Sequence, residues 1–128
     1  MLHVTNGTSV SLAETGLGGE ILVWLDVLHE GPVPAAIPDD ELRRVRARFL
    51  EETWPREHSA AHALERRDQT LAAHGEIVLW FEHDLFDQLQ LIQILERCSR
   101  TPPPLLALIC TDRYLGPLSP AELAALWP

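Results

Sequence analysis

The chain has 128 residues, the usual size of one domain, and 46% of them are hydrophobic, so a buried core is expected. Its net charge of −9 argues against non-specific binding to DNA, RNA or anionic membranes, because each of these needs a positive protein surface. All ten cationic residues are arginines, which excludes catalysis by a lysine of this chain.

Short apolar runs alternate along the chain with longer helical segments. The continuous runs have the character of strands that are buried on both faces, and turn residues such as Asn-Gly or Pro-rich stretches separate them from the helices. In chain order the sequence predicts a strand at 2–5, a short helix at 8–14, a strand at 21–25, helices at 39–52 and 57–73, a strand at 77–81, a helix at 84–98, a strand at 105–110 and a helix from 119.

Polar residues at the starts of these helices are the expected caps, because their side chains accept from free backbone N–H groups. Ser119 gives the clearest signal, since Pro120 and Glu122 complete a capping box after it. The other expected caps are Thr8 or Ser9, Asp39 or Asp40, and Asp84 or Asp87.

Alternating apolar strands and helices indicate a parallel sheet with helices on both faces. The two-helix connection between the second and third strands is long enough to pass behind the first strand. Right-handed crossovers then give a three-layer αβα sandwich with strand order 2-1-3-4, which is flavodoxin-like or Rossmann-like. We expect residues 1–128 to form one such domain.

Polar residues collect where the predicted strands end. In open parallel sheets ligands bind beyond the carboxyl ends of the strands, where loops diverge and helix N-termini offer free N–H groups. The loop from His29 to Pro38 is expected to form one wall of this region. The candidate ligand-binding residues are Asn6, Gly7, Thr8, Ser9, Asp26, His29 and Gln88.

The chemistry of the third strand end suits a hard cation. Asp26, Glu82 and Asp84 are candidate ligands for Mg²⁺, which prefers carboxylate oxygens. His83 is a candidate general acid or base, so Glu82, His83 and Asp84 form the candidate catalytic set. A small anionic ligand such as a phosphate compound would bind beside the cation.

Each of these residues also has a purely structural interpretation. Asn6-Gly7 can be only a turn, Asp26 a loop cap, and Asp84 or Asp87 a helix cap. Glu82 can be paired with Arg113, the cation that follows the fourth strand. Trp24 and Trp80 are expected in the core, and Cys98 and Cys110 as reduced thiols of a cytoplasmic protein. No apolar run reaches the length of a membrane span.

Four segments together resemble the bacterial family named domain of unknown function 1835. These segments are "LHVTNGTSV" from Leu2, "GEILVWLDVLHEGPVP" from Gly19, "LWFEHDLFDQLQLIQIL" from Leu79 and "LSPAELAALWP" from Leu118. The resemblance covers nearly the whole chain. It implies a shared polar set at Asn6, Asp26, Gly31, Pro32, Glu82, His83, Asp84 and Gln88, but no activity.

Two departures from the family pattern matter. The first motif in the family usually reads Asn-Gly-Asp-Ser, whereas here it reads Asn6-Gly7-Thr8-Ser9, so Thr8 keeps a capping hydroxyl and loses a carboxylate ligand. Members also tend to be longer, which would make this chain the N-terminal part of a longer architecture.

Two functions from different classes follow. One is a metal-assisted enzyme acting on a phosphate-containing or nucleotide ligand, and the other is a non-catalytic ligand-binding or regulatory domain of bacterial signalling or transcription. The enzyme would be favoured if the carboxylates of Glu82, Asp26 and Asp84 lie together with oxygens free to bind a metal. Pairing of these carboxylates with arginine and backbone N–H groups would favour the binding domain or a structural module.

Overall fold

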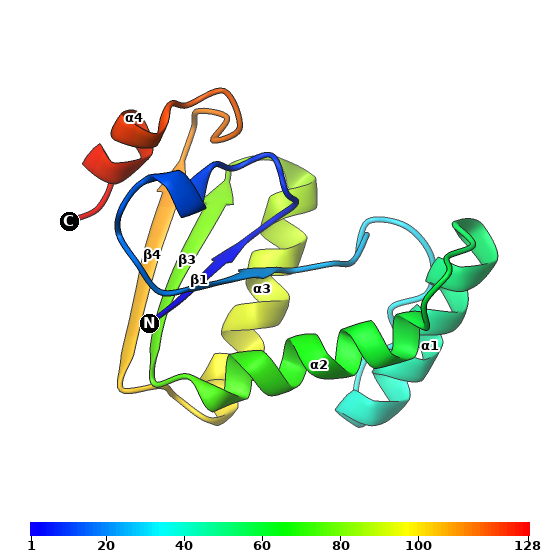
Figure 1. Cartoon of the computed structure of the whole chain (residues 1–128). Helices are drawn as coiled ribbons and strands as arrows, with labels where there is room; N and C mark the ends of the chain where they lie inside the picture. The colour runs from blue at the N-terminus through cyan, green and yellow to red at the C-terminus, as the bar shows by residue number, and fades with distance from the viewer.

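The computed structural model describes all 128 residues. Four strands form one sheet, and four α-helices and a short 3₁₀ helix connect or follow them (Figure 1). In chain order the elements are β1 (Leu2–Thr5), η1 (Leu12–Glu14), β2 (Glu20–Val23), α1 (Asp39–Thr53), α2 (Ala60–Ala73), β3 (Glu76–Glu82), α3 (Leu85–Arg100), β4 (Leu105–Thr111) and α4 (Pro120–Ala125).

The sheet is parallel throughout and has the order β2-β1-β3-β4, as the sequence predicts. In the register, Thr5 at the end of β1 lies opposite Val23 of β2 and Trp80 of β3. The strand ends therefore meet at one edge of the sheet, where we expect the functional residues.

Helices cover both faces of the sheet, which confirms the α/β sandwich. On one face α2 and α3 pack on the strands through a cluster that includes Trp24, Leu79 and Ile94. On the other face η1 and α4 pack through a cluster that includes Trp80 and Leu123. Both tryptophans are fully buried, as predicted.

Helix α1 does not lie on the sheet. It packs on α2 through a small third cluster, and Figure 1 shows α1 and the adjoining N-terminal part of α2 projecting to the side of the molecule away from β4. The buried members of this third cluster are Ala47, Leu50, Ala60 and Leu64.

Three local expectations were wrong. The helix expected at 8–14 is only the 3₁₀ turn η1, and neither Thr8 nor Ser9 caps it. Helix α1 has Pro38 at its N-cap position with no side-chain cap, so neither Asp39 nor Asp40 has that role. By contrast, Asp84 caps α3 and Ser119 forms the full capping box of α4.

Both cysteines are free thiols. No helix has the length and apolar character needed to cross a bilayer.

Candidate functional site

The crevice between β1 and β3 is the point where neighbouring strands send their connections to opposite faces. The β1 connection passes through η1 on one face, whereas β3 leads into α3 on the other. Asn6 bridges the crevice, because its side-chain amide donates a hydrogen bond to the carboxylate of Asp87 on α3. The other oxygen of Asp87 accepts from the backbone N–H of Glu82 at 2.6 Å.

Three carboxylates meet at this point. Glu82, Asp84 and Asp87 each offer an oxygen, and the three oxygens lie within 4.8 Å of one another. We call these three residues the acidic cluster. The strand end supplies Glu82, the N-cap of α3 supplies Asp84, and the first turn of α3 supplies Asp87.

Burial and mutual repulsion disfavour the ionised form of two carboxylates in the acidic cluster. Burial raises the pKa of Glu82 above its ordinary value, and the neighbouring carboxylates of Asp87 and Asp84 raise it further, against the hydrogen bond from Leu115 N–H. Burial also raises the pKa of Asp87, with a further contribution from Asp84. A cation placed among these oxygens would remove this repulsion.

No arginine neutralises the acidic cluster. The sequence suggested Arg113 as a partner for Glu82, but its guanidinium lies 3.6 Å from Glu122 on α4 instead. The side chain of Glu82 accepts from the backbone N–H of Leu115 at 2.6 Å, which fixes the loop between β4 and α4. Glu82 therefore has a structural contact through one oxygen.

The loop after β1 lies beside the acidic cluster. Gly7 has a φ of +77°, which glycine adopts without strain, and the N–H groups of Gly7, Thr8 and Ser9 make no backbone hydrogen bonds. An open hollow at the surface is lined by Ser9, Glu82, Tyr114, Gly116 and Pro117. The arrangement combines carboxylate oxygens with free N–H groups at one edge.

His83 and Gln88 occupy different environments at this edge. The ring of His83 is exposed and lies 6.1 Å from the ring of Tyr114, centroid to centroid. The amide of Gln88 donates to the backbone oxygen of Glu82 at 2.7 Å. His83 is therefore free to meet a ligand, whereas Gln88 is held to the strand end.

Asp26 requires a correction, because it does not join Glu82 and Asp84. Its carboxylate is buried in an ion pair with Arg46 of α1 at 2.6 Å, and each side chain is about 1% exposed. The guanidinium also donates to the carbonyls of Val27, Glu30 and Pro32. Asp26 is therefore an anchor for the loop after β2 and not a ligand of the acidic cluster.

The loop from His29 to Pro38 reaches this edge at one point. The ring of His29 packs edge-on against Phe86 in the first turn of α3, with the centroids 5.1 Å apart. Gly31 lies against Phe49 of α1, where a Cβ atom would be only 2.5 Å from the aromatic ring. The expected pocket wall is thus confined to His29, and the loop then turns toward α1.

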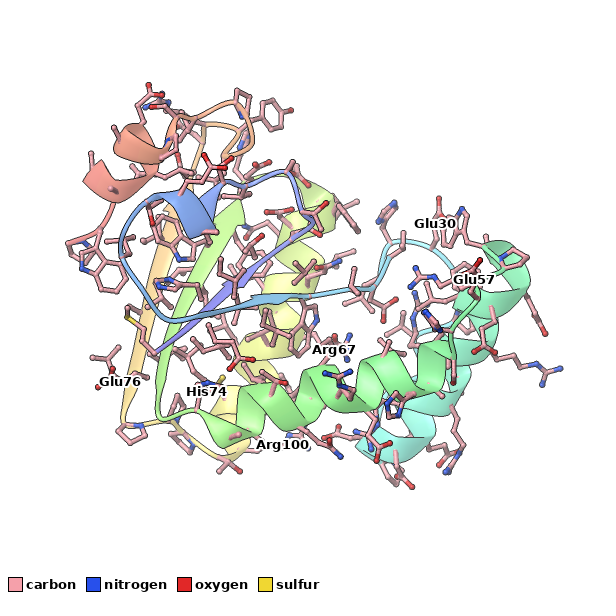
Figure 2. All side chains as sticks on the ribbon, in the orientation of Figure 1. Glu30, Glu57, Arg67, His74, Glu76 and Arg100 are labelled. Atoms are coloured by element: carbon pink, nitrogen blue, oxygen red, sulfur yellow. The ribbon has the colours of Figure 1, made fainter.

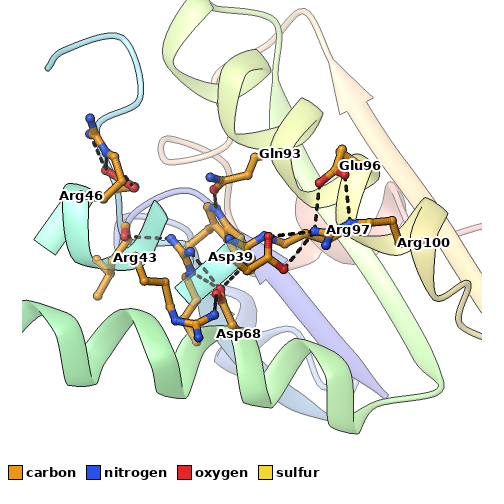
Figure 3. Close-up of polar contacts among 12 residues, drawn as sticks. Asp39, Arg43, Arg46, Asp68, Gln93, Glu96, Arg97 and Arg100 are labelled. Atoms are coloured by element: carbon orange, nitrogen blue, oxygen red, sulfur yellow. Dashed lines mark hydrogen bonds and ion pairs between the residues drawn. The ribbon is translucent and has the colours of Figure 1, made fainter. Parts of the chain in front are cut away.

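The sequence analysis missed a network of buried and half-buried arginines. The carboxylate of Asp68 on α2 binds Arg43, Arg67 and Arg97, from α1, α2 and α3 (Figure 3). The guanidinium of Arg67 lies 4.0 Å from the ring centroid of Trp24. This network joins the three helices, and within it only Nη2 of Arg97 is buried without a hydrogen-bond partner.

A hollow of about 400 Å³ adjoins this network at the opposite, amino edge of the sheet. His74, Glu76 and Arg100 lie at that edge in Figure 2. The charged groups that line the hollow are largely paired, since Arg97 binds Asp68 and Arg100 binds Asp39. It is therefore a weaker candidate than the acidic cluster.

The fold and the acidic cluster define a parallel α/β domain with a carboxylate site at its switch point. No family model, no curated protein and no solved structure matches the chain. The resemblance to domain of unknown function 1835 therefore stays a prediction.

Proposed function

We propose that the chain binds a divalent cation such as Mg²⁺ at the acidic cluster, and through it a phosphate-containing ligand. The observation that carries the proposal is the meeting of three carboxylate oxygens within 4.8 Å with no arginine among them. Mg²⁺ commonly binds to one or two protein carboxylates while it keeps waters and substrate phosphates as its other ligands.

The loop after β1 supports the second half of the proposal. Its free N–H groups at Gly7, Thr8 and Ser9 favour an anion, whereas the acidic cluster alone would repel one. The N-terminus of α3, which begins at Leu85, adds a partial positive charge at the same edge. A phosphate bridged to the cation satisfies both kinds of group.

Ligand binding is better supported than catalysis. Asp87 uses both oxygens in contacts within the chain, and Asp26 is paired elsewhere, so the cluster has fewer open ligands than the sequence suggested. The enzyme alternative rests on His83, whose exposed ring follows Glu82 directly and is a candidate general acid or base.

The first test is a calorimetric and thermal titration with Mg²⁺ or Mn²⁺. A cation at about 100 times its Kd would stabilise the wild type by about 2.7 kcal/mol. Glu82→Gln keeps an oxygen for Leu115 N–H, and Asp84→Asn keeps a good N-cap, so both should fold and lose most of the response. Asp112→Asn, an exposed change outside the acidic cluster, should respond like the wild type. An equal response in all four proteins, or none in the wild type, would contradict the proposal.

The second test adds inorganic phosphate or a nucleotide in the presence of the cation. Binding that requires the cation supports the proposal, and binding that is equal without it contradicts the bridged arrangement. Turnover of the nucleotide that His83→Ala abolishes, with cation affinity unchanged, would favour the enzyme alternative.

A further inference from the structure

The outer edge of β4 has no partner strand, although Leu126 and Pro128 of the C-terminal segment line a hollow beside its carboxyl end. β4 is the last strand of the sheet and pairs only with β3, so one row of its peptide N–H and C=O groups has no partner strand. Its sequence, LLALICT, contains no charge and no proline, and its register with β3 continues without a bulge. Native proteins block such edges with charges, prolines, bulges or a covering element, because an open edge pairs with other strands.

Apolar side chains continue this open edge onto α3. On β4, Leu106 and Leu108 are 39% and 48% exposed and lie with Cys110 on the α3 side of the sheet, because their partners on β3 belong to the cluster that packs on α3. On α3, Leu85, Ile92 and Leu95 are 67%, 61% and 37% exposed and recur at the spacing of one helix face. We call these five residues with Cys110 the β4–α3 face.

A contact joins the two halves of the β4–α3 face. Gln88, which lies between Leu85 and Ile92 on the same helix stripe, has its amide nitrogen 3.6 Å from the sulfur of Cys110. The five large side chains expose on the order of 400 Å² of apolar surface, as much as the largest patch on a typical monomer. A patch of this size beside an open strand edge is typical of an interaction site.

We propose that the β4–α3 face is a dimer interface, in which β4 pairs antiparallel with β4 of a second copy about a two-fold axis at Leu108. The open edge requires that the partner supply a strand, and the apolar stripe requires that it supply an apolar surface of the same length. The face itself meets both requirements. Two chains of charge −9 repel one another, and the uncharged strand is where copies can approach without facing like charges.

The two-fold arrangement matches side chains along the interface. Leu108 faces its own counterpart, and Leu106 faces Cys110 of the second copy. With rises of about 1.5 Å per helical residue and about 3.3 Å per strand residue, Ile92 lies level with Leu108, so the two Ile92 side chains meet near the axis. Gln88 then lies level with Glu96 of the second copy.

Pairing of the β4 edges gives one continuous eight-stranded sheet, because each copy contributes four strands. The two acidic clusters then lie at opposite ends of the dimer, since the two copies of β4 run in opposite directions. This inference does not depend on the proposed cation site, and the two proposals are tested by separate experiments.

Sedimentation and light scattering test the state of association. The wild type should have twice the monomer mass of 14.4 kDa, with a Tm that rises with protein concentration. Leu108→Lys places a charge on the axis and should give a folded monomer. Val33→Lys is the matched control, because Val33 is 46% exposed in the loop after β2, and it should stay dimeric. A wild type that is monomeric at all concentrations overturns the proposal and assigns the edge to a different segment or protein.

Disulfide formation tests the register. In a Cys110→Ser background, Leu108→Cys should form a covalent dimer under oxidised glutathione, because the two substituted positions face one another across the axis. Leu105→Cys has nearly the same exposure, but its counterpart lies about 20 Å away, beyond the reach of a disulfide. Equal cross-linking of both variants, or none at position 108, would show that the two-fold register is wrong.

Discussion

Asp26 and Arg46 place one charge of each sign almost completely inside the protein. All five N–H groups of the guanidinium are used, because Arg46 binds the carboxylate and the three carbonyls of Val27, Glu30 and Pro32. Removal of one partner leaves the other charge buried without compensation. We therefore expect Arg46→Ala to lower the free energy of unfolding by about 3–5 kcal/mol in a urea titration.

The exposed pair of Arg44 and Asp40 gives the matched comparison. Its two side chains are 69% and 60% exposed and lie 3.5 Å apart within one helix. Arg44→Ala should change the free energy of unfolding by no more than about 0.5 kcal/mol. Similar losses for the two variants would mean that the Asp26–Arg46 pair does not anchor the loop.

Glu82 gives a pH dependence with a defined sign. Its pKa is raised in the folded protein, so the native state binds this proton more tightly than the unfolded chain does. The stabilising contribution is fully present below the ordinary value of 4.5 and is lost as the pH rises through the raised value. Glu82→Gln removes this loss, so its stability relative to the wild type should increase with pH over this range. Parallel curves of unfolding free energy against pH would contradict this expectation.

At the scale of elements, the sequence predicted what local rules determine. Continuous apolar runs gave β1, β3 and β4 to within one residue at each end, and the crossover rule gave the strand order. Asp84 and Ser119 cap their helices because the side chain and the N–H group that it accepts from are three residues apart. The same closeness in sequence explains why Glu82 and Asp84 were identified as neighbours.

The features that the sequence did not predict depend on contacts between segments that are distant in the chain. Asp26 and Arg46 meet only because α1 packs beside the loop after β2, and no local pattern distinguishes Arg46 from the exposed arginines of α1. Asp39 does not cap α1, and its carboxylate binds Arg100 of α3 at 3.0 Å. β2 ends at Val23 although the apolar run continues to Leu25, so the length of a run does not determine where a strand stops.

At the scale of the whole molecule, most buried apolar residues pack on the sheet and few lie between α1 and α2. β3 lies between two large clusters, with Leu79 packed on one face and Trp80 on the other. The α1–α2 pair is joined by only four buried residues and by ion pairs such as that of Arg43 with Asp68. Segments with few buried apolar contacts open at lower free energy than a central strand.

We therefore expect native-state hydrogen exchange to show α1 opening before the sheet does. Amides of α1 should have lower opening free energies than those of β3. Leu50→Ala, in the cluster between α1 and α2, should reduce the stability of this contact by about 2–5 kcal/mol. The exchange of α1 amides should then accelerate while the slowest β3 amides keep their opening free energy. Equal losses of protection in α1 and β3 would show instead that the α1–α2 pair and the sheet unfold as one cooperative unit.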